Sequence, residues 1–314
     1  MKTGIFLLTL FSMLVAWSLG ITGDSASASA ATTATVHSLD GPVFDLSTFG
    51  AVGDGVTNDG PALQQALNAI AQAGGGTLFV PAGRYVITTP VLKDFTGTGA
   101  SLTILGVGSS TPVNADGDGA ALTRGLDLTS EFVIRTGLST TALTLRGLDS
   151  LLISEMVFIG TPGVATDAHI SLGIYDVANA VIQHCEFYGL STMLAGGAVV
   201  RTDNSRLTIE ATVFLGCTGN SGVRNSVVTA STWKDLSVTN TVFADYGQRP
   251  DFFGKTGFTA AYSWILVGNT APVTNLSPRR AVNIRDVFMD EGGFFGIAVV
   301  PDFFDSRSPA SDLI

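Results

Sequence analysis

Two aspartates stand at corresponding places in successive copies of a short repeat, which is where a repeating chain would carry a pair of catalytic carboxylates. Asp176 lies six residues before Ile182, and Asp203 lies six residues before Ile209. If the copies stack, we expect the two carboxylates to be adjacent on one face, suited to general acid and base catalysis on a glycosidic bond or to binding a cation such as calcium. Because Asn204 follows Asp203, the alternative interpretation is a pair of turn-forming residues at strand ends.

Further polar residues of the repeats extend this candidate site. Arg201 and His184 could assist catalysis, Arg201 as a cation and His184 as a group that carries a proton. Glu155 and His184 each lie three residues before a repeated phenylalanine, so we expect them to be outward-pointing neighbours or, alternatively, separate solvated residues. Asp167 and His169 form another candidate pair, whose register within the repeat the sequence does not define. The residues predicted to contact a substrate are Glu155, Tyr175, Glu210, Tyr246 and Arg249.

These candidates belong mainly to a segment that repeats itself imperfectly beyond Ala142. Five copies carry short strands rich in β-branched residues, and each contains a marker phenylalanine: Phe158, Phe187, Phe214, Phe243 and Phe288. Spacings of 29, 27, 29 and 45 residues between the markers indicate a solenoid of stacked coils. Apolar residues five and seven positions before the first four markers are expected to face the core, since side chains alternate along a strand. The positions three before the markers, expected to form an outward row, are Glu155, His184, Ala211, Asn240 and Arg285.

The longest interval, between Phe243 and Phe288, contains an insertion rich in aromatic residues. Tyr246 and Arg249 lie in it, together with Trp264. Such an insertion could form one wall of a sugar-binding groove on the outside of the solenoid. The alternative is that the aromatic side chains pack the inserted loop onto the core.

The first 41 residues are predicted to lie outside the folded domain. Residues 1–30 have the features of a secretory signal peptide: Lys2, an apolar stretch over residues 5–19, and small residues at Ala28 and Ala30 before the expected cleavage site. Residues 31–41 are a linker rich in Ser, Thr and Ala, and residues 42–314 form the domain. The apolar stretch is shorter than the ~20 residues of a membrane-spanning helix, so we expect a secreted, extracellular product with no membrane association after cleavage.

Composition narrows the classes of function. With 46% hydrophobic and 13% charged residues the chain is expected to be ordered, and its 37 glycines favour many tight turns between short strands. A net charge of −10 without long basic runs argues against nucleic acid as a partner. Two cysteines, Cys185 and Cys217, are too few to stabilise a fold of this size, so we expect two free buried thiols rather than a disulfide.

The segment that opens the domain follows simple local rules. Asp59 precedes an early proline and apolar residues at helical spacing, so we expect it to cap a helix of about three turns that stops at the glycines of residues 74–76. Residues 77–80 and 84–87 are predicted to be two short strands around a turn. Asp54 lies in a turn flanked by glycines, so we interpret both Asp54 and Asp59 as structural rather than catalytic.

The same segment resembles a known family. Its FGAVGDGVTND, GGGTLFVPAGRY and LTILGVG motifs, in this order, are similar to the opening of the pectate lyase superfamily domain. The resemblance implies an all-β fold, a single-stranded right-handed parallel β-helix with a short N-terminal capping α-helix, and a polysaccharide as partner, such as a pectin-like cell-wall glycan. Because lyases, glycoside hydrolases, epimerases and phage tailspikes share this fold, the resemblance does not identify the reaction.

The active-site signatures of individual subfamilies are absent. A galacturonase-type hydrolase would carry NTD, DD, GHG and RxK motifs, whereas this chain has RTDN at residues 201–204 and no GHG. An alginate epimerase would carry a YxxDxH-like site, and here Tyr175, Asp176 and His184 have a different spacing. We therefore predict a secreted polysaccharide lyase or glycoside hydrolase, with a non-catalytic glycan-binding or structural β-helix as the alternative. Calcium is the one cofactor that the acidic pair suggests.

Overall fold

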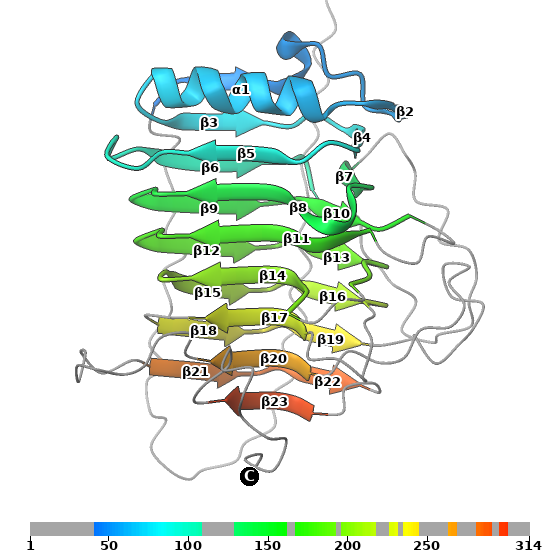
Figure 1. Ribbon diagram of the computed structural model, residues 1–314, viewed down its shortest axis with the longest axis vertical. Helices are drawn as coiled ribbons and strands as arrows, with labels where there is room; N and C mark the ends of the chain where they lie inside the picture. The colour runs from blue at the N-terminus through cyan, green and yellow to red at the C-terminus, as the bar shows by residue number, and fades with distance from the viewer. Residues whose placement is uncertain are drawn as a thin grey trace, which may run out of the picture. The chain divides into compact units, whose positions relative to one another are not determined.

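The computed structural model describes residues 41–108, 129–161, 167–192, 196–217, 226–231, 235–244, 263–268, 281–290 and 295–300. In these residues the strands form three parallel sheets, which we name A, B and C (Figure 1). Sheet A contains β1 (Val43–Asp45), β3 (Gly76–Phe79), β6 (Ser101–Leu105), β9 (Ser150–Ser154), β12 (Asn179–Gln183), β15 (Arg206–Glu210), β18 (Asp235–Thr239) and β21 (Ala281–Arg285). Sheet B contains β2 (Asp54–Asn58), β4 (Gly83–Ile87), β7 (Ser130–Ile134), β10 (Val157–Ile159), β13 (Glu186–Tyr188), β16 (Val213–Leu215), β19 (Val242–Ala244) and β22 (Phe288–Asp290). Sheet C contains β5 (Val91–Asp94), β8 (Gly137–Arg146), β11 (Ala168–Tyr175), β14 (Ala198–Asp203), β17 (Ser226–Ser231), β20 (Ser263–Gly268) and β23 (Phe295–Val300).

Each coil adds one strand to sheet A, then one to sheet B and then one to sheet C, so neighbouring strands of a sheet come from successive coils. In the first coil the helix α1 (Gly60–Gln72) follows β2 in place of a sheet C strand, and it covers the N-terminal end of the stack (Figure 1). This arrangement is the right-handed parallel β-helix with an N-terminal capping helix that the sequence predicts.

Matching inward residues of successive coils form ladders in the core. Phe158, Phe187, Phe214 and Phe243 are buried and stack in parallel, with ring centres 4.8, 4.6 and 4.8 Å apart. An aliphatic ladder in sheet A contains Ile104, Ile153, Ile182, Ile209 and Val238, all with 0% exposure. Both ladders confirm the predicted inward positions of the first four copies.

The fifth copy is offset by one residue from the prediction. Met289, not Phe288, aligns with Phe243, while Phe288 aligns with Val242 and is 60% exposed. The corresponding turn residue is therefore Asp286 rather than Arg285. The reason is that the inward residue of sheet B always lies five positions after the inward residue of sheet A, whereas it is not always an aromatic residue.

Two kinds of short turn recur along the solenoid, and each holds one residue in the left-handed backbone conformation. This conformation costs a non-glycine residue about 1–2 kcal/mol. Between sheets A and B, φ is 47–58° at Glu155, His184, Ala211, Asn240 and Asp286. Between sheets C and A, φ is 71°, 53° and 50° at Gly147, Asp176 and Asn204. These repeated turns point their side chains outward, and the connections from sheet B to sheet C are the long ones.

The opening segment confirms the predicted helix and both strands, with two differences. The strands β3 and β4 belong to different sheets, because the turn between them is a corner of the β-helix. Asp59 makes no side-chain bond to α1. Its buried carboxylate instead accepts hydrogen bonds from the backbone N–H groups of Val52 and Gly53, at 2.7 and 3.3 Å, and so holds the preceding loop.

The remaining predictions concern the two cysteines, the N-terminal segment, two residues of the insertion and the membrane. Cys185 and Cys217 are free and buried, as predicted. The proposed signal peptide and most of the linker lie outside the described residues, as do Tyr246 and Arg249. Among the residues that the structure describes, no helix is long and apolar enough to cross a membrane.

Candidate functional site

The outward face of sheet C gathers polar and charged residues from three neighbouring strands. Along β11, Leu172 and Ile174 are buried in the core, so the alternating residues Gly173 and Tyr175 face outward. Tyr175 aligns with the last residue of β8 on one side and the last residue of β14 on the other. We name the outward group the sheet C cluster, which consists of Arg146, His169, Tyr175, Arg201 and Asp203.

Tyr175 is the centre of this cluster. Its ring lies back across Gly173, since a Cβ atom at residue 173 would come within 2.6 Å of the ring and 3.0 Å of the hydroxyl oxygen. The Arg146 guanidinium carbon lies 5.5 Å from the ring centre, a cation–π distance. Burial raises the pKa of the Tyr175 hydroxyl above its usual value of 10.0, with Arg201 acting in the opposite direction. Tyr175 therefore keeps its proton at neutral pH and can act as a proton donor.

Arg201 lies on β14, the strand next to the one that carries His169 and Tyr175. It aligns with Gly173, and its Nη1 atom lies 3.5 Å from the carbonyl oxygen of Gly196. Burial, together with the positive charge of Arg201, lowers the pKa of His169 below 6.5. The Nδ1 atom of His169 is buried and accepts or donates no hydrogen bond within the described part of the chain. His169 is thus neutral at physiological pH and can accept a proton.

Asp176 and Asp203, the predicted carboxylate pair, do not occupy equivalent positions in successive coils. Asp203 aligns with Tyr175, while Asp176 occupies the following turn at the position of Asn204. The turn after β11 has three residues, 176–178, whereas the turn after β14 has two, 204–205, so counting back from the isoleucines misaligns the pair by one position. The carboxylate of Asp176 accepts a hydrogen bond from Asn204 Nδ2 at 2.8 Å and lies 3.6 Å from Arg146 Nε. Asp176 is therefore a turn residue that also orients Arg146.

The other predicted residues lie on a different part of the solenoid. Glu155 and His184 are outward neighbours, as predicted, with His184 Nδ1 3.2 Å from Glu155 Oε1. They occupy the turn between sheets A and B, and Glu210 ends β15 of sheet A beside them, where its carbonyl oxygen accepts a hydrogen bond from the His184 backbone N–H at 3.2 Å. The structure thus separates Glu155, His184 and Glu210 from the sheet C cluster. Trp264 is 2% exposed and packs against the core ring of Phe243, so it forms no groove wall.

Comparison with known proteins identifies the family. Residues 43–264 match the family described as Rhamnogalacturonase A/epimerase, pectate lyase-like. The chain belongs to this family. Two curated relatives come from Azotobacter vinelandii: mannuronan C5-epimerase AlgE1, 50% identical over 46 residues, and alginate lyase 7, 44% identical over 45 residues. These matches cover 15% and 14% of this chain but only 3% and 5% of the relatives, so the chain corresponds to a small part of each.

Two solved structures are similar over most of the chain at low identity. A putative glycosyl hydrolase from Parabacteroides merdae has a TM-score of 0.42 and 12% identity, covering 79% of this chain and 97% of that one. Tailspike protein gp49 of Acinetobacter baumannii bacteriophage Fri1, a capsular polysaccharide depolymerase, has a TM-score of 0.29 and 11% identity, covering 84% and 63%.

Within this pectate lyase-like chain, sequence reasoning missed Arg146 altogether. Arg146 directly precedes Gly147, which occupies the same left-handed turn position as Asp176. This spacing could have predicted that Arg146 lies beside Tyr175, the residue before Asp176. His169 was a candidate whose position only the strand pairing defines. Among the described residues, no three carboxylate, histidine or cysteine side chains come together as a metal site would require.

Proposed function

We propose that this pectate lyase-like protein is a secreted polysaccharide lyase that cleaves an acidic, uronate-containing extracellular polysaccharide on the outer face of sheet C. The observation that carries the proposal is that Arg201 aligns with Gly173, against which the Tyr175 ring lies, on the same outer face as His169. The positive charge of Arg201 also lowers the pKa of His169 and opposes the rise in the pKa of Tyr175. A proton acceptor, a proton donor and a cation are the three groups that elimination next to a carboxylate requires.

In this proposal the residues divide the reaction as follows. Neutral His169 accepts the proton from the sugar carbon next to the carboxylate, while Arg201 and Arg146 stabilise the negative charge that develops on that carboxylate. The electron pair of the broken C–H bond forms a C=C bond, and the glycosidic C–O bond breaks. Tyr175 donates its proton to the leaving glycosidic oxygen. Water then returns a proton to Tyr175 and removes one from His169.

Two further points support a lyase over a glycoside hydrolase. Hydrolysis uses two free carboxylates on opposite sides of the bond, about 5–9.5 Å apart, but the Asp176 carboxylate is bonded to Asn204 and faces Arg146. The names of the two curated relatives, an alginate lyase and a mannuronan epimerase, also refer to acidic polymers. Asp203 remains a candidate for contacting substrate beside Tyr175.

The test is a survey of substrates with the mature protein and matched variants. Alginate, polygalacturonate, xylan and β-glucan are incubated with and without calcium, and both ultraviolet absorbance of unsaturated ends and reducing sugar are followed. We expect unsaturated ends from one of the two acidic polymers and a loss of about 10²–10³-fold in rate for Arg201→Ala. Arg285→Ala, at an exposed arginine on sheet A, is the control and should retain the wild-type rate.

Three other outcomes of this survey would contradict the proposal. Reducing sugar without unsaturated ends would identify a hydrolase and contradict the proposal. Binding without cleavage of any polymer would favour the non-catalytic glycan-binding alternative. Equal losses of cleavage rate in Arg201→Ala and Arg285→Ala would show that the sheet C cluster is not the active site.

A further inference from the structure

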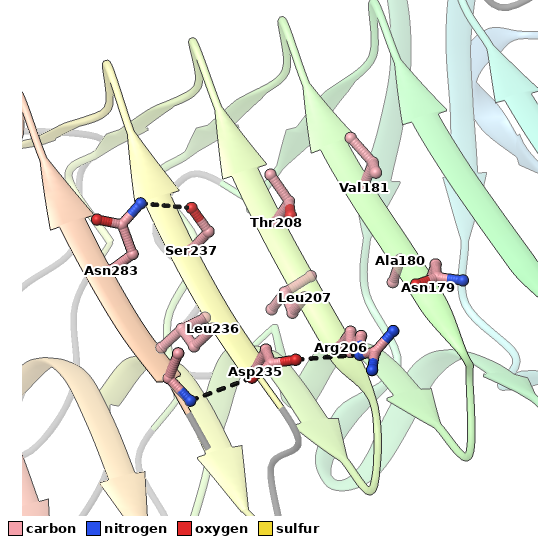
Figure 2. A pocket seen from close by; sticks show the side chains of 11 residues that line it. Asn179, Ala180, Val181, Arg206, Leu207, Thr208, Asp235, Leu236, Ser237 and Asn283 are labelled. Atoms are coloured by element: carbon pink, nitrogen blue, oxygen red, sulfur yellow. Dashed lines mark hydrogen bonds and ion pairs between the residues drawn. The ribbon is translucent and has the colours of Figure 1, made fainter. Parts of the chain in front are cut away.

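A shallow hollow of about 290 Å³ lies on the outer face of sheet A, away from the sheet C cluster, across β12, β15, β18 and β21 (Figure 2). Two rows of outward side chains line it, one residue from each strand in each row. The first row is Asn179, Arg206, Asp235 and Ala281, and the second is Val181, Thr208, Ser237 and Asn283.

Small outward residues create this hollow on a rigid base. Thr208, Ser237 and Ala281 are short side chains beside the longer Arg206, Asp235 and Asn283. Beneath them, Leu207 and Leu236 point inward and are 1% exposed, so the strands that form the floor are held by the core. The strand pairing keeps the polar groups of successive coils at the regular spacing of a parallel sheet, about 4.8 Å.

The polar groups around the hollow are already oriented by one another. Arg206 Nε lies 3.0 Å from Asp235 Oδ2, and Asn283 Nδ2 donates to Ser237 Oγ at 3.3 Å (Figure 2). The other carboxylate oxygen of Asp235 accepts a hydrogen bond from the Ala281 backbone N–H at 3.1 Å. The side chains of Arg206 and Asp235 are 59% and 41% exposed, so a ligand can reach both.

We propose that this hollow binds the hydroxyl groups of an uncharged polysaccharide chain lying across the coils. A guanidinium paired with a carboxylate presents donors and acceptors side by side, which matches neighbouring sugar hydroxyls that each donate and accept. Thr208 and Ser237 add hydroxyls and Asn283 adds an amide at successive coils. A repeating surface of this kind is suited to a repeating polymer.

The charges favour a neutral glycan over an acidic one. Asp235 neutralises Arg206, so the hollow offers no net positive charge to a carboxylate. The chain as a whole carries a net charge of −10, which repels a polyanion from a surface that has no net positive charge of its own. This second site is independent of the reaction proposed for sheet C, because none of its residues belongs to the sheet C cluster.

The experiment measures retention of the mature protein by electrophoresis in gels that contain xylan, β-glucan or alginate. We expect xylan or β-glucan to retard the protein, with little effect of added NaCl because the recognition is not between net charges. Thr208→Trp fills the hollow and should weaken apparent binding about tenfold, the loss expected when one or two hydrogen bonds are removed. Asn283→Ala, which adds no bulk, should weaken binding in the same direction.

The matched control is Thr103→Trp, which changes the same residue type in the same row of sheet A but lies in β6, outside the hollow. It should keep wild-type retention. The proposal is overturned if neither neutral glycan retards the wild type, if retention requires alginate and disappears with salt, or if Thr103→Trp loses as much as Thr208→Trp. Arg201→Ala should keep full retention, so failure of the lyase reaction and failure of this site are distinguishable.

Discussion

At the scale of single residues, the ring of Tyr175 lies against the backbone of Gly173, which makes the outer face of β11 sensitive to one methyl group. An added Cβ would lie 2.6 Å from the ring, closer than carbon atoms pack, so the ring would have to move. The hydroxyl would then shift relative to Arg201 in the next coil. Gly173 is thus a positioning residue for the proposed proton donor.

We predict that Gly173→Ala lowers kcat by about 10- to 100-fold, because displacing a reacting group by about 1 Å can cost that much. The measurement is the rate of formation of unsaturated ends on the acidic polymer identified by the survey. Tyr175→Phe is the reference, and Gly173→Ala should add little to the loss in the double variant, since both act through the same hydroxyl. Fully additive losses would contradict this role.

A second residue-scale prediction concerns pH. Because the pKa of His169 is lowered by burial and by Arg201, kcat/KM should fall as the pH drops through a value below 6.5, where His169 gains a proton. The raised pKa of Tyr175 should keep the alkaline limb above pH 10.0. Arg201→Gln removes the positive charge, so the acid limb of the residual activity should move upward, and Arg285→Gln should leave it in place. An unchanged acid limb in the pH profile of Arg201→Gln would show that His169 is not the proton acceptor of the reaction.

At the scale of elements, the stability of the solenoid depends on the ladders in its core. Each rung contacts the same position in the coils before and after it, so one substitution disturbs three coils. The aliphatic ladder of sheet A and the stacked phenylalanines of sheet B belong to one continuous core. Their alignment also keeps the outward rows of sheet C in register.

We predict that Ile182→Ala lowers the free energy of unfolding by about 2–5 kcal/mol, because it removes a fully buried side chain from the middle of a ladder. Urea denaturation followed by circular dichroism measures this change. Gln183→Ala, at the next and outward position of β12, is the control and should change stability by less than about 0.5 kcal/mol. A loss below this value for Ile182→Ala would show that the ladder is not needed.

At the scale of the whole molecule, the proposed secretion exposes two free thiols to an oxidising compartment. Cys185 and Cys217 are 2% and 0% exposed, and their sulfur atoms donate to the carbonyl oxygens of Ile153 and Phe187 at 3.5 and 3.4 Å. Burial raises the pKa of Cys185 to about 12, so its reactive thiolate form is scarce. The fold itself would thus protect the thiols.

We predict that neither cysteine reacts with a thiol reagent in the folded, secreted protein and that both react after denaturation. The measurement is thiol titration with and without denaturant, and N-terminal sequencing of the same sample should show that residues 1–30 have been removed. Rapid labelling of the folded protein, or a disulfide found after denaturation, would contradict the first part. A retained Met1 would contradict the second.

The sequence alone determined most of the fold. The spacing of inward apolar residues, repeated every coil, and the motifs that open the domain both predict a parallel β-helix with a capping helix. They do so because burial follows strand periodicity, a local property. The exception at Phe288 has the same cause, since the constant spacing from the inward residue of sheet A, and not the residue type, sets the register.

The tertiary structure decided which outward residues share a surface. Asp176 and Asp203 occupy equal positions by counting, but a turn shorter by one residue aligns Asp203 with Tyr175 instead. Arg146 and His169 joined the cluster only through strand pairing, while Glu155 and His184 were placed on another side. Outward side chains carry no periodic signal of burial, so their neighbours depend on turn lengths accumulated over coils, and these only the folded chain shows.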